Sequence, residues 1–297
     1  MSVDMSVFVK FWGARGSIPT PGSWTRVYGG NTSCVEIRFD DTVLICDAGS
    51  GIRDLGNELV GRNPRPNLLH LLITHTHWDH IQGFPFFAPA HIPEMKIHLY
   101  GTVLGDDSRY QLLSGQMSSA YFPVGFGDLG AEIISDHLVE GVKDIEGVKV
   151  TCFPTNHPGG CFAYVFEKTD RKIVYLTDNE FELQPGDKFP DTDHTGPLRQ
   201  VPPEMVAAVR GADLLICDAH YDDETYGQRI GWGHSSCLTV TDFAIQAEVA
   251  GLALFHHDPD ASDEDVDQKV DSCRARAAKF GSQVVVFAAR EGVELKI

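Results

Sequence analysis

The chain has 297 residues, of which 42% are hydrophobic, and a formal net charge of −18. This length allows one large domain or two small ones, and we expect a single domain over residues 1–297. The acidic charge disfavours a protein that binds nucleic acid by neutralising its phosphates. No apolar run approaches the ~20 residues of a membrane span, and no signal-peptide pattern opens the chain. We therefore predict a cytoplasmic protein without a membrane partner.

Strand and helix patterns alternate along the whole chain. Short runs rich in apolar and β-branched residues predict strands at Val7–Trp12, Cys34–Phe39, Thr42–Cys46, Leu68–Ile73, Lys96–Leu99, Val148–Phe153, Phe162–Glu167, Lys172–Leu176, Leu214–Cys217, Leu252–Phe255 and Val284–Phe287. Helical patterns cover Gly51–Val60, Tyr110–Ala120, Pro203–Arg210, Cys237–Ala250 and Asp263–Phe280. The opening strands read as a meander, which favours mixed sheets. We predict the α+β class, as an αββα sandwich of two mixed sheets flanked by helices.

Seven scattered cysteines form no C-x-x-C pair. Several lie inside apolar runs, as Cys46 and Cys217 do. The sequence therefore predicts buried free thiols, with neither disulfides nor a sulfur-ligated zinc.

Histidines and a carboxylate gather directly after the predicted strand Leu68–Ile73. His75, His77, Asp79 and His80 fall within six positions. In extended backbone His75 and His77 point to the same side, and a turn would aim Asp79 and His80 at a neighbouring point. Imidazole and carboxylate are ligands of first-row metals. This spacing indicates two adjacent metal sites on one loop, and a solvated histidine-rich loop is the alternative.

Further candidate ligands stand at other strand ends. His157 follows the strand Val148–Phe153, and Asp178 ends the strand after Lys172, where one carboxylate can serve two cations. His256 and His257 both follow Leu252–Phe255, and spacing alone does not choose between them.

Two more strands end in acids, and one helix has a clear start. Asp47 and Asp218 are turn formers or carboxylates that support the metal ligands. His220 supports the site or lies on the surface. Ser262 caps a helix whose first turn is acidic, which favours the helix dipole.

The H-x-H-x-D-H pattern with a distant His, Asp and His resembles the metallo-β-lactamase-fold hydrolases, and most closely their ribonuclease Z-like phosphodiesterase branch. Segments across nearly the whole chain carry the likeness: Gly13–Pro19 and Gly30–Cys34 resemble its opening region, Leu44–Gly51 its first acid-ended strand, and Leu254–His256 its Leu-Thr-His.

The resemblance implies a dinuclear centre. One metal would take His75, His77 and His157, and the other Asp79, His80 and His256, with Asp178 bridging; His256 is then the ligand and His257 is not. Flavin-partnered diiron relatives carry an acid where His77 stands, so redox chemistry is disfavoured. Two divalent ions are implied, with zinc favoured and manganese or iron also compatible with the ligands.

The residues also suggest how such a centre would cleave a phosphodiester. Gly233–Ser236 resembles the Gly-His-Ser-Thr motif of the branch, whose histidine is proposed to protonate the leaving group, and this role falls to His234. Ser235 or Ser236 can cap the following helix, leaving N–H groups for a phosphate. The alternative is that His234 only packs and Ser235 only caps. The resemblance further implies that Asp79 acts as general base besides being a ligand.

Three segments bear on the substrate. Gly101–Gly130 lacks the basic, Gly/Pro-rich character of the arm that grips tRNA in ribonuclease Z. Phe181–Pro203 is a lid or an inert excursion, and the aromatic run Gly83–Phe87 stacks a base or packs in the core.

These features favour a phosphodiesterase of small substrates such as cyclic nucleotides, and a tRNA partner is disfavoured. The alternatives are a lactone or thioester hydrolase, an RNA-processing nuclease, and a non-catalytic metal-binding signalling module. The natural substrate and a homodimer stay open.

Overall fold

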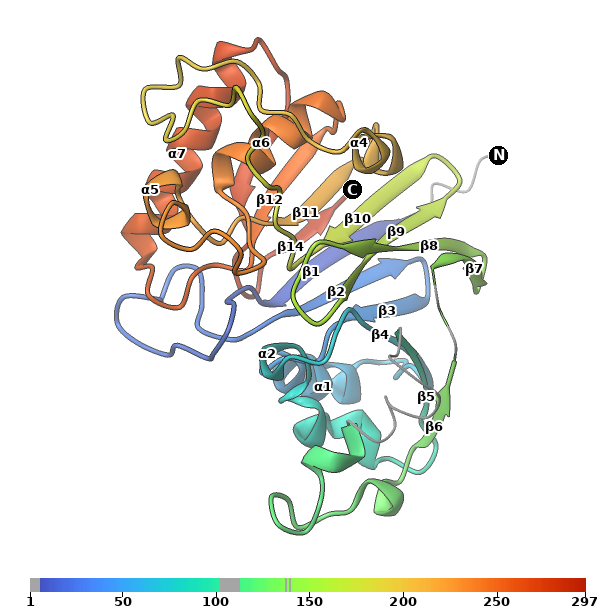
Figure 1. Cartoon of the computed structure of the whole chain (residues 1–297). Coiled ribbons are helices and arrows are strands. Elements are labelled where there is room, and N and C mark those ends of the chain that lie inside the picture. The colour runs from blue at the N-terminus through green and yellow to red at the C-terminus, as the bar shows by residue number, and fades with distance from the viewer. Residues whose placement is uncertain (1–5, 102–112, 137, 139) are drawn as a thin grey trace. The chain divides into compact units, whose positions relative to one another are not determined.

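The computed structural model of the chain describes residues 6–101, 113–136, 138 and 140–297 (Figure 1). The chain divides into two compact units. The first unit comprises Met1–Pro21, Gly29–Gly141 and Arg290–Ile297, and the second comprises Gly22–Tyr28 and Val142–Ala289. Each unit is built on one seven-stranded sheet. That the two units together act as one domain stays a prediction.

The sheet of the first unit is mixed. Its strand order is β14-β1-β2-β3-β4-β5-β6. The strands β14, β1, β2 and β3 pair antiparallel, whereas β3, β4, β5 and β6 pair parallel. The strands are β1 Val7–Gly13, β2 Cys34–Phe39, β3 Thr42–Cys46, β4 Leu68–Ile73, β5 Lys96–Gly101, β6 Glu132–Ser135 and β14 Glu294–Lys296.

The core of the first unit explains why β4 is a continuous apolar run. β4 has a parallel neighbour on each side, and five of its six residues are buried. Parallel strands buried on both faces carry such runs. Helix α1 (Ile52–Gly61) packs Ile52, Leu55 and Leu59 into the same core, at helical spacing. The short elements α2 Trp78–Ile81, η1 Phe84–Phe86, η2 Ala88–His91 and η3 Phe126–Asp128 also belong to this unit.

The second unit repeats the same plan. Its sheet has the order β13-β12-β11-β10-β9-β8-β7, parallel from β13 to β10 and antiparallel from β10 to β8. The strands are β7 Gly141–Ile145, β8 Val148–Thr155, β9 Cys161–Lys168, β10 Arg171–Leu176, β11 Leu214–Asp218, β12 Gly251–Phe255 and β13 Val285–Ala288. The helices are α4 Pro203–Val209, α5 Asp223–Tyr226, α6 Cys237–Gln246 and α7 Asp263–Lys279. Helices α6 and α7 pack against each other beside β11, β12 and β13 (Figure 1).

Most predicted elements are confirmed, including the meander β1-β2-β3 and the two mixed sheets with helices. Ser262 is the N-cap of α7, as predicted, and it also forms a capping box with Asp265. Helix α6 ends at Gln246 rather than Ala250, because Glu248 takes a left-handed backbone conformation with φ of 54°. For the predicted helix over 110–120, residues 110–112 lie outside the described residues, and residues 113–116 are helical.

The prediction missed the strands β6, β7 and β14, which are short or largely exposed. All seven cysteines are buried thiols outside any disulfide, as expected. Burial raises the pKa of Cys34, Cys46 and Cys217, so these thiols are unreactive core groups. Within the described residues, no helix is long and apolar enough to cross a membrane.

Candidate metal centre

The predicted ligands follow the ends of strands in both units. His75, His77, Asp79 and His80, here called the first ligand set, lie after β4 in the first unit. His157, Asp178 and His256, the second ligand set, follow β8, β10 and β12 in the second unit. Strand ends are where open α/β sheets usually present ligand-binding groups.

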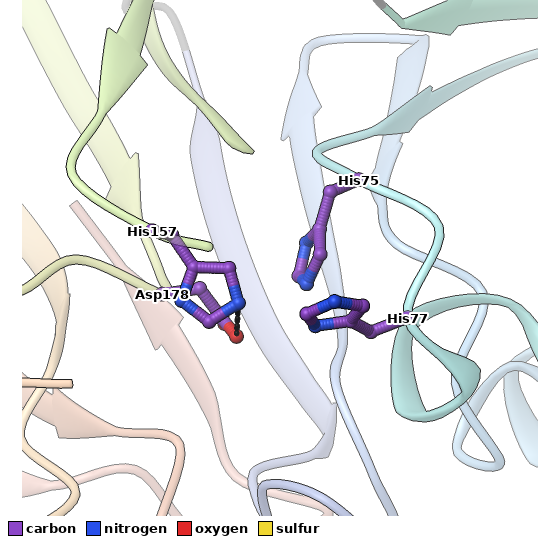
Figure 2. A group of neighbouring side chains, drawn as sticks. All are labelled: His75, His77, His157 and Asp178. Atoms are coloured by element: carbon purple, nitrogen blue, oxygen red, sulfur yellow. Dashed lines mark ion pairs between the residues drawn. The ribbon is translucent and has the colours of Figure 1, made fainter. Parts of the chain in front are cut away.

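The first ligand set is held on a tight turn. His77 is the N-cap of α2, and the short helix turns Asp79 and His80 back toward the end of the strand. The rings of His75 and His77 lie side by side, with centroids 4.5 Å apart (Figure 2). The His75 and His80 rings are 4.3 Å apart, and His80 Nε2 lies 3.3 Å from Asp79 Oδ2. The nitrogen and oxygen donors of this loop therefore converge.

Asp47 fixes the orientation of His80. It follows β3 with φ of 62°, and its carboxylate accepts hydrogen bonds from the Thr74 amide at 2.8 Å and the Thr74 hydroxyl at 3.0 Å. His80 Nδ1 lies 2.7 Å from Asp47 Oδ2, and both side chains are fully buried. Nδ1 therefore donates to the carboxylate, which leaves Nε2 as the ligand atom. Asp47 supports the site, as one of its two predicted roles states.

The glycine-rich segments near the N-terminus brace this loop. The Ser17 amide donates to Asp79 Oδ2 at 2.7 Å. A Cβ on Gly49 would lie 2.2 Å from the Asp79 carbonyl oxygen and 2.6 Å from Thr32 Oγ1, so only glycine fits there. Thr32 and Ser50 exchange two hydrogen bonds of 2.9 Å. The motifs at Gly13–Pro19, Gly30–Cys34 and Leu44–Gly51 are thus parts of one support for the ligand loop.

In the second ligand set, Asp178 faces two histidines with its two oxygens. Its Oδ2 lies 3.6 Å from His157 Nε2, as the dashed line in Figure 2 marks, and its Oδ1 lies 3.4 Å from His256 Nε2. Asp178 and His256 both adopt left-handed backbone, with φ of 46° and 58°, and this turns their side chains at the strand ends. One carboxylate oriented toward two imidazoles is the arrangement that bridging of two cations requires.

Glu180, which the sequence did not single out, holds the loop behind His157. Its buried carboxylate accepts three hydrogen bonds of 2.8 Å, from the Tyr226 hydroxyl and from the amides of Gly231 and Gly233. The Gly233 carbonyl in turn accepts from His157 Nδ1 at 2.9 Å, which leaves His157 Nε2 facing Asp178. Burial and then the bond to Glu180 raise the pKa of Tyr226, so this phenol stays a donor. A lone acid two residues after a predicted ligand was the only available signal.

His234 and Asp218 form a buried pair. His234 Nδ1 lies 2.6 Å from Asp218 Oδ2, so the carboxylate holds the imidazole with Nε2 directed away from it. The His234, His220 and His256 rings contact one another, with centroids 4.5 Å apart for His234 and His220, 4.9 Å for His234 and His256, and 5.2 Å for His220 and His256. His220 Nδ1 donates to the His256 carbonyl at 2.7 Å. Burial, followed by the neighbouring His234 and His256, lowers the pKa of His220 well below its ordinary value. His220 is thus a neutral support of His256 and not a surface residue.

Contacts also define the roles of His257, Ser235 and Ser236. His257 Nε2 lies 2.9 Å from the Ala289 carbonyl, so His256 is the residue of this pair that faces Asp178. Ser236 is the N-cap of α6. Ser235 instead bonds to the Asn179 carbonyl and the Phe181 amide. The expectation that the first N–H groups of α6 await a phosphate is wrong for two of them, because the Cys237 amide donates to Tyr221 O and the Leu238 amide to Ser236 Oγ.

Contacts and burial distinguish between the predicted roles of the segment Phe181–Pro203 and of the aromatic run Gly83–Phe87. In the segment Phe181–Pro203, Arg199 pairs with Asp223, and Asp191 pairs with Arg276, all of them buried. These ion pairs anchor residues 191–199 to the second unit and argue against a swinging lid. In the aromatic run, Phe84 and Phe87 are fully buried in the core, whereas Phe86 is 59% exposed. Of the segment Gly101–Gly130, residues 102–112 lie outside the described residues.

The donors present suit divalent metal ions. In two of the proposed ligands, His80 and His157, a carboxylate or a carbonyl engages Nδ1 and leaves Nε2 available. Such partners fix the tautomer of metal-binding histidines. Nitrogen and carboxylate oxygen ligands without sulfur fit zinc, manganese or iron.

The profile of the family described as "Beta-lactamase superfamily domain" matches residues 42–257. The chain belongs to this superfamily.

A protein named ribonuclease Z from Haloarcula marismortui is 24% identical over 330 aligned residues, covering 99% of this chain and 97% of that protein. Two solved structures share the fold. The metallo-β-lactamase fold protein YhfI from Bacillus subtilis has a TM-score of 0.68 at 18% identity, covering 98% of this chain and all of YhfI. A diphosphatase from the PhnP family has a TM-score of 0.65 at 16% identity, covering 98% of both chains.

These comparisons confirm the predicted fold, the likeness to ribonuclease Z and the enzyme class. The chain is a metal-dependent hydrolase of the metallo-β-lactamase fold. The name of the Haloarcula relative gives no support to the prediction that tRNA is disfavoured.

Proposed function

We propose that the two ligand sets form one dinuclear metal centre that hydrolyses small phosphodiesters. One ion would be held by His75, His77 and His157, and the other by Asp79, His80 and His256, with Asp178 shared. The observation that carries the proposal is Asp178, whose Oδ2 and Oδ1 face His157 and His256, respectively. Zinc is the proposed metal, and manganese or iron fit the same donors.

When bound, two divalent ions would lower the pKa of a water molecule and stabilise charge on the phosphoryl oxygens. The protein itself supplies a proton donor. Asp218 accepts a hydrogen bond from His234 Nδ1 and stabilises the protonated imidazolium, whose Nε2–H can then protonate the leaving alkoxide. Asp79, proposed as ligand and general base, has its Oδ2 already held by the Ser17 amide. A phosphodiester requires such a donor because its leaving group is poor, and this requirement favours phosphodiesters over activated carboxylic substrates.

RNA processing is the second candidate, since the Haloarcula relative is named ribonuclease Z. The net charge of −18 weighs against a long polyanion, because each added phosphate must be brought toward an acidic protein. We therefore place small phosphodiesters first.

The test is a substrate panel for the metal-loaded protein: bis-p-nitrophenyl phosphate, cyclic AMP, a precursor tRNA and a lactone. We expect turnover of the first two, and His234→Ala should lower this turnover while metal content stays at the wild-type value. Absence of phosphodiester turnover at full metal occupancy would refute the proposal. Metal loss in His234→Ala would show that His234 is not the proton donor.

A further inference from the structure

A pocket of about 570 Å³ lies within the second unit beside His157. His157 and Gly233 both line it, so it adjoins a proposed metal ligand and the backbone directly before His234. All its lining residues belong to the second unit. Pockets of roughly 300–1,000 Å³ are typical for small organic ligands, and a nucleoside fits this range.

One part of the pocket wall is apolar. Pro158, Leu183 and Ile230 line it, and the Ile230 side chain is 57% exposed. Covering an exposed apolar side chain with a flat ring removes apolar surface from water, which favours binding of the ring. This part of the wall therefore suits the face of a planar ring.

The polar part of the wall bears carboxylates. Glu180 and Glu182 line the pocket with Asn156, and no lysine or arginine does so among the described residues. The Glu180 carboxylate is already engaged by three donors. Glu182 receives one 3.3 Å hydrogen bond from the Asn156 amide, through Oε1. Its exposed carboxylate can accept from the amino or hydroxyl groups of a ligand, while it repels additional phosphates.

We propose that this pocket binds the nucleoside part of a mononucleotide phosphodiester, with the base against Ile230 and its donor groups toward Glu182. This inference rests on the proposed phosphodiesterase activity. It adds the substrate class, namely phosphodiesters whose alcohol part is a nucleoside. A neutral ring with hydrogen-bond donors fits the wall, whereas a chain with a phosphate at every residue does not.

The first experiment measures binding without chemistry. Adenosine, a neutral probe, is titrated against the full-length protein by saturation-transfer NMR, with Ile230→Trp as the variant that fills the pocket. The matched control is Val285→Trp, because Val285 is 64% exposed on β13 and does not line the pocket. We expect Ile230→Trp to weaken adenosine binding at least tenfold and Val285→Trp to leave it within twofold. Adenosine that does not bind the wild type, or that binds both variants equally, would overturn the inference.

The second experiment measures selectivity. Ile230→Trp should lose at least tenfold more kcat/KM on cyclic AMP than on methyl p-nitrophenyl phosphate, which lacks a nucleoside. Glu182→Lys should raise the ratio of kcat/KM for the phosphorylated dinucleotide pApA over cyclic AMP at least fivefold. Equal losses on both substrates, or an unchanged ratio, would contradict the assigned occupant. If adenosine binds as expected but no phosphodiester is cleaved, the pocket stands and the proposed function is wrong.

Discussion

Two glycines in the loop before His234 give a matched test of how His157 is held. Gly231 and Gly233 have φ of 85° and 86°, so alanine at either position pays the same left-handed strain of about 1–2 kcal/mol. Their surroundings differ. A Cβ on Gly231 meets nothing within 4 Å, whereas a Cβ on Gly233 would lie 2.4 Å from His157 Nδ1.

Because ordinary contact begins near 3.4 Å, the His157 ring must move by roughly 1 Å in Gly233→Ala. That movement breaks the 2.9 Å bond from Nδ1 to the Gly233 carbonyl. Loss of such a supporting hydrogen bond typically lowers metal affinity about 10- to 100-fold. We expect this loss in Gly233→Ala, and wild-type affinity in Gly231→Ala.

The assay is competition with a chromophoric chelator for Zn²⁺, with urea unfolding as the measure of strain in both variants. Gly231→Ala should lose unfolding free energy by the backbone strain alone, whereas Gly233→Ala should lose more because of the overlap with His157, and only Gly233→Ala should lose metal affinity. Equal metal affinity in both variants would show that the Gly233 contact does not position His157 as a ligand.

Three further predictions follow from single contacts. Asp218→Asn should lower kcat on cyclic AMP by about 10²-fold or more with metal content intact, because the amide no longer fixes the His234 tautomer; a change in KM alone would contradict this role. Glu180→Gln turns one donor toward the loop amides and should lower the unfolding free energy by about 1–3 kcal/mol in urea titrations, and an unchanged midpoint would refute it. Burial lowers the pKa of His70 from 6.5 to about 4, so the unfolded state binds the proton at a higher pH than the folded state does. The free energy of unfolding should therefore fall by about 1–3 kcal/mol as the pH drops from 6.5 to 4. This part of the pH dependence should vanish in His70→Leu, and a variant with the wild-type slope would show that His70 does not cause it.

The sequence predicted the elements with the strongest local signals. β4 carries a continuous apolar run because both its neighbours are parallel, and its boundaries were predicted as observed. The start of α7 was predicted from the N-cap Ser262 and the acidic first turn that follows it. β7 and β14 were missed because they are short and largely exposed, so their side chains show no apolar pattern.

The site could be predicted only where the chemistry sits in one motif or in a family resemblance. The loop from His75 to His80 concentrates its donors locally. The roles of Glu180 and Asp47 depend on amides and side chains that are distant in the sequence, such as Gly233 and Thr74. A single acid carries no signal for such contacts. The spacing of His256 and His257 did not show which of them faces Asp178, and only the contacts in the folded chain distinguish them.

In the proposed centre, two metal ions share Asp178. The direct measurement is metal content per chain together with the electron paramagnetic resonance spectrum of the Mn²⁺-loaded protein. A shared carboxylate holds two ions about 3.5–4 Å apart, so their spins should be coupled. We predict two ions per chain with a coupled spectrum, and loss of the coupling in Asp178→Asn. A single ion, or two ions with an uncoupled spectrum in the wild type, would contradict the account.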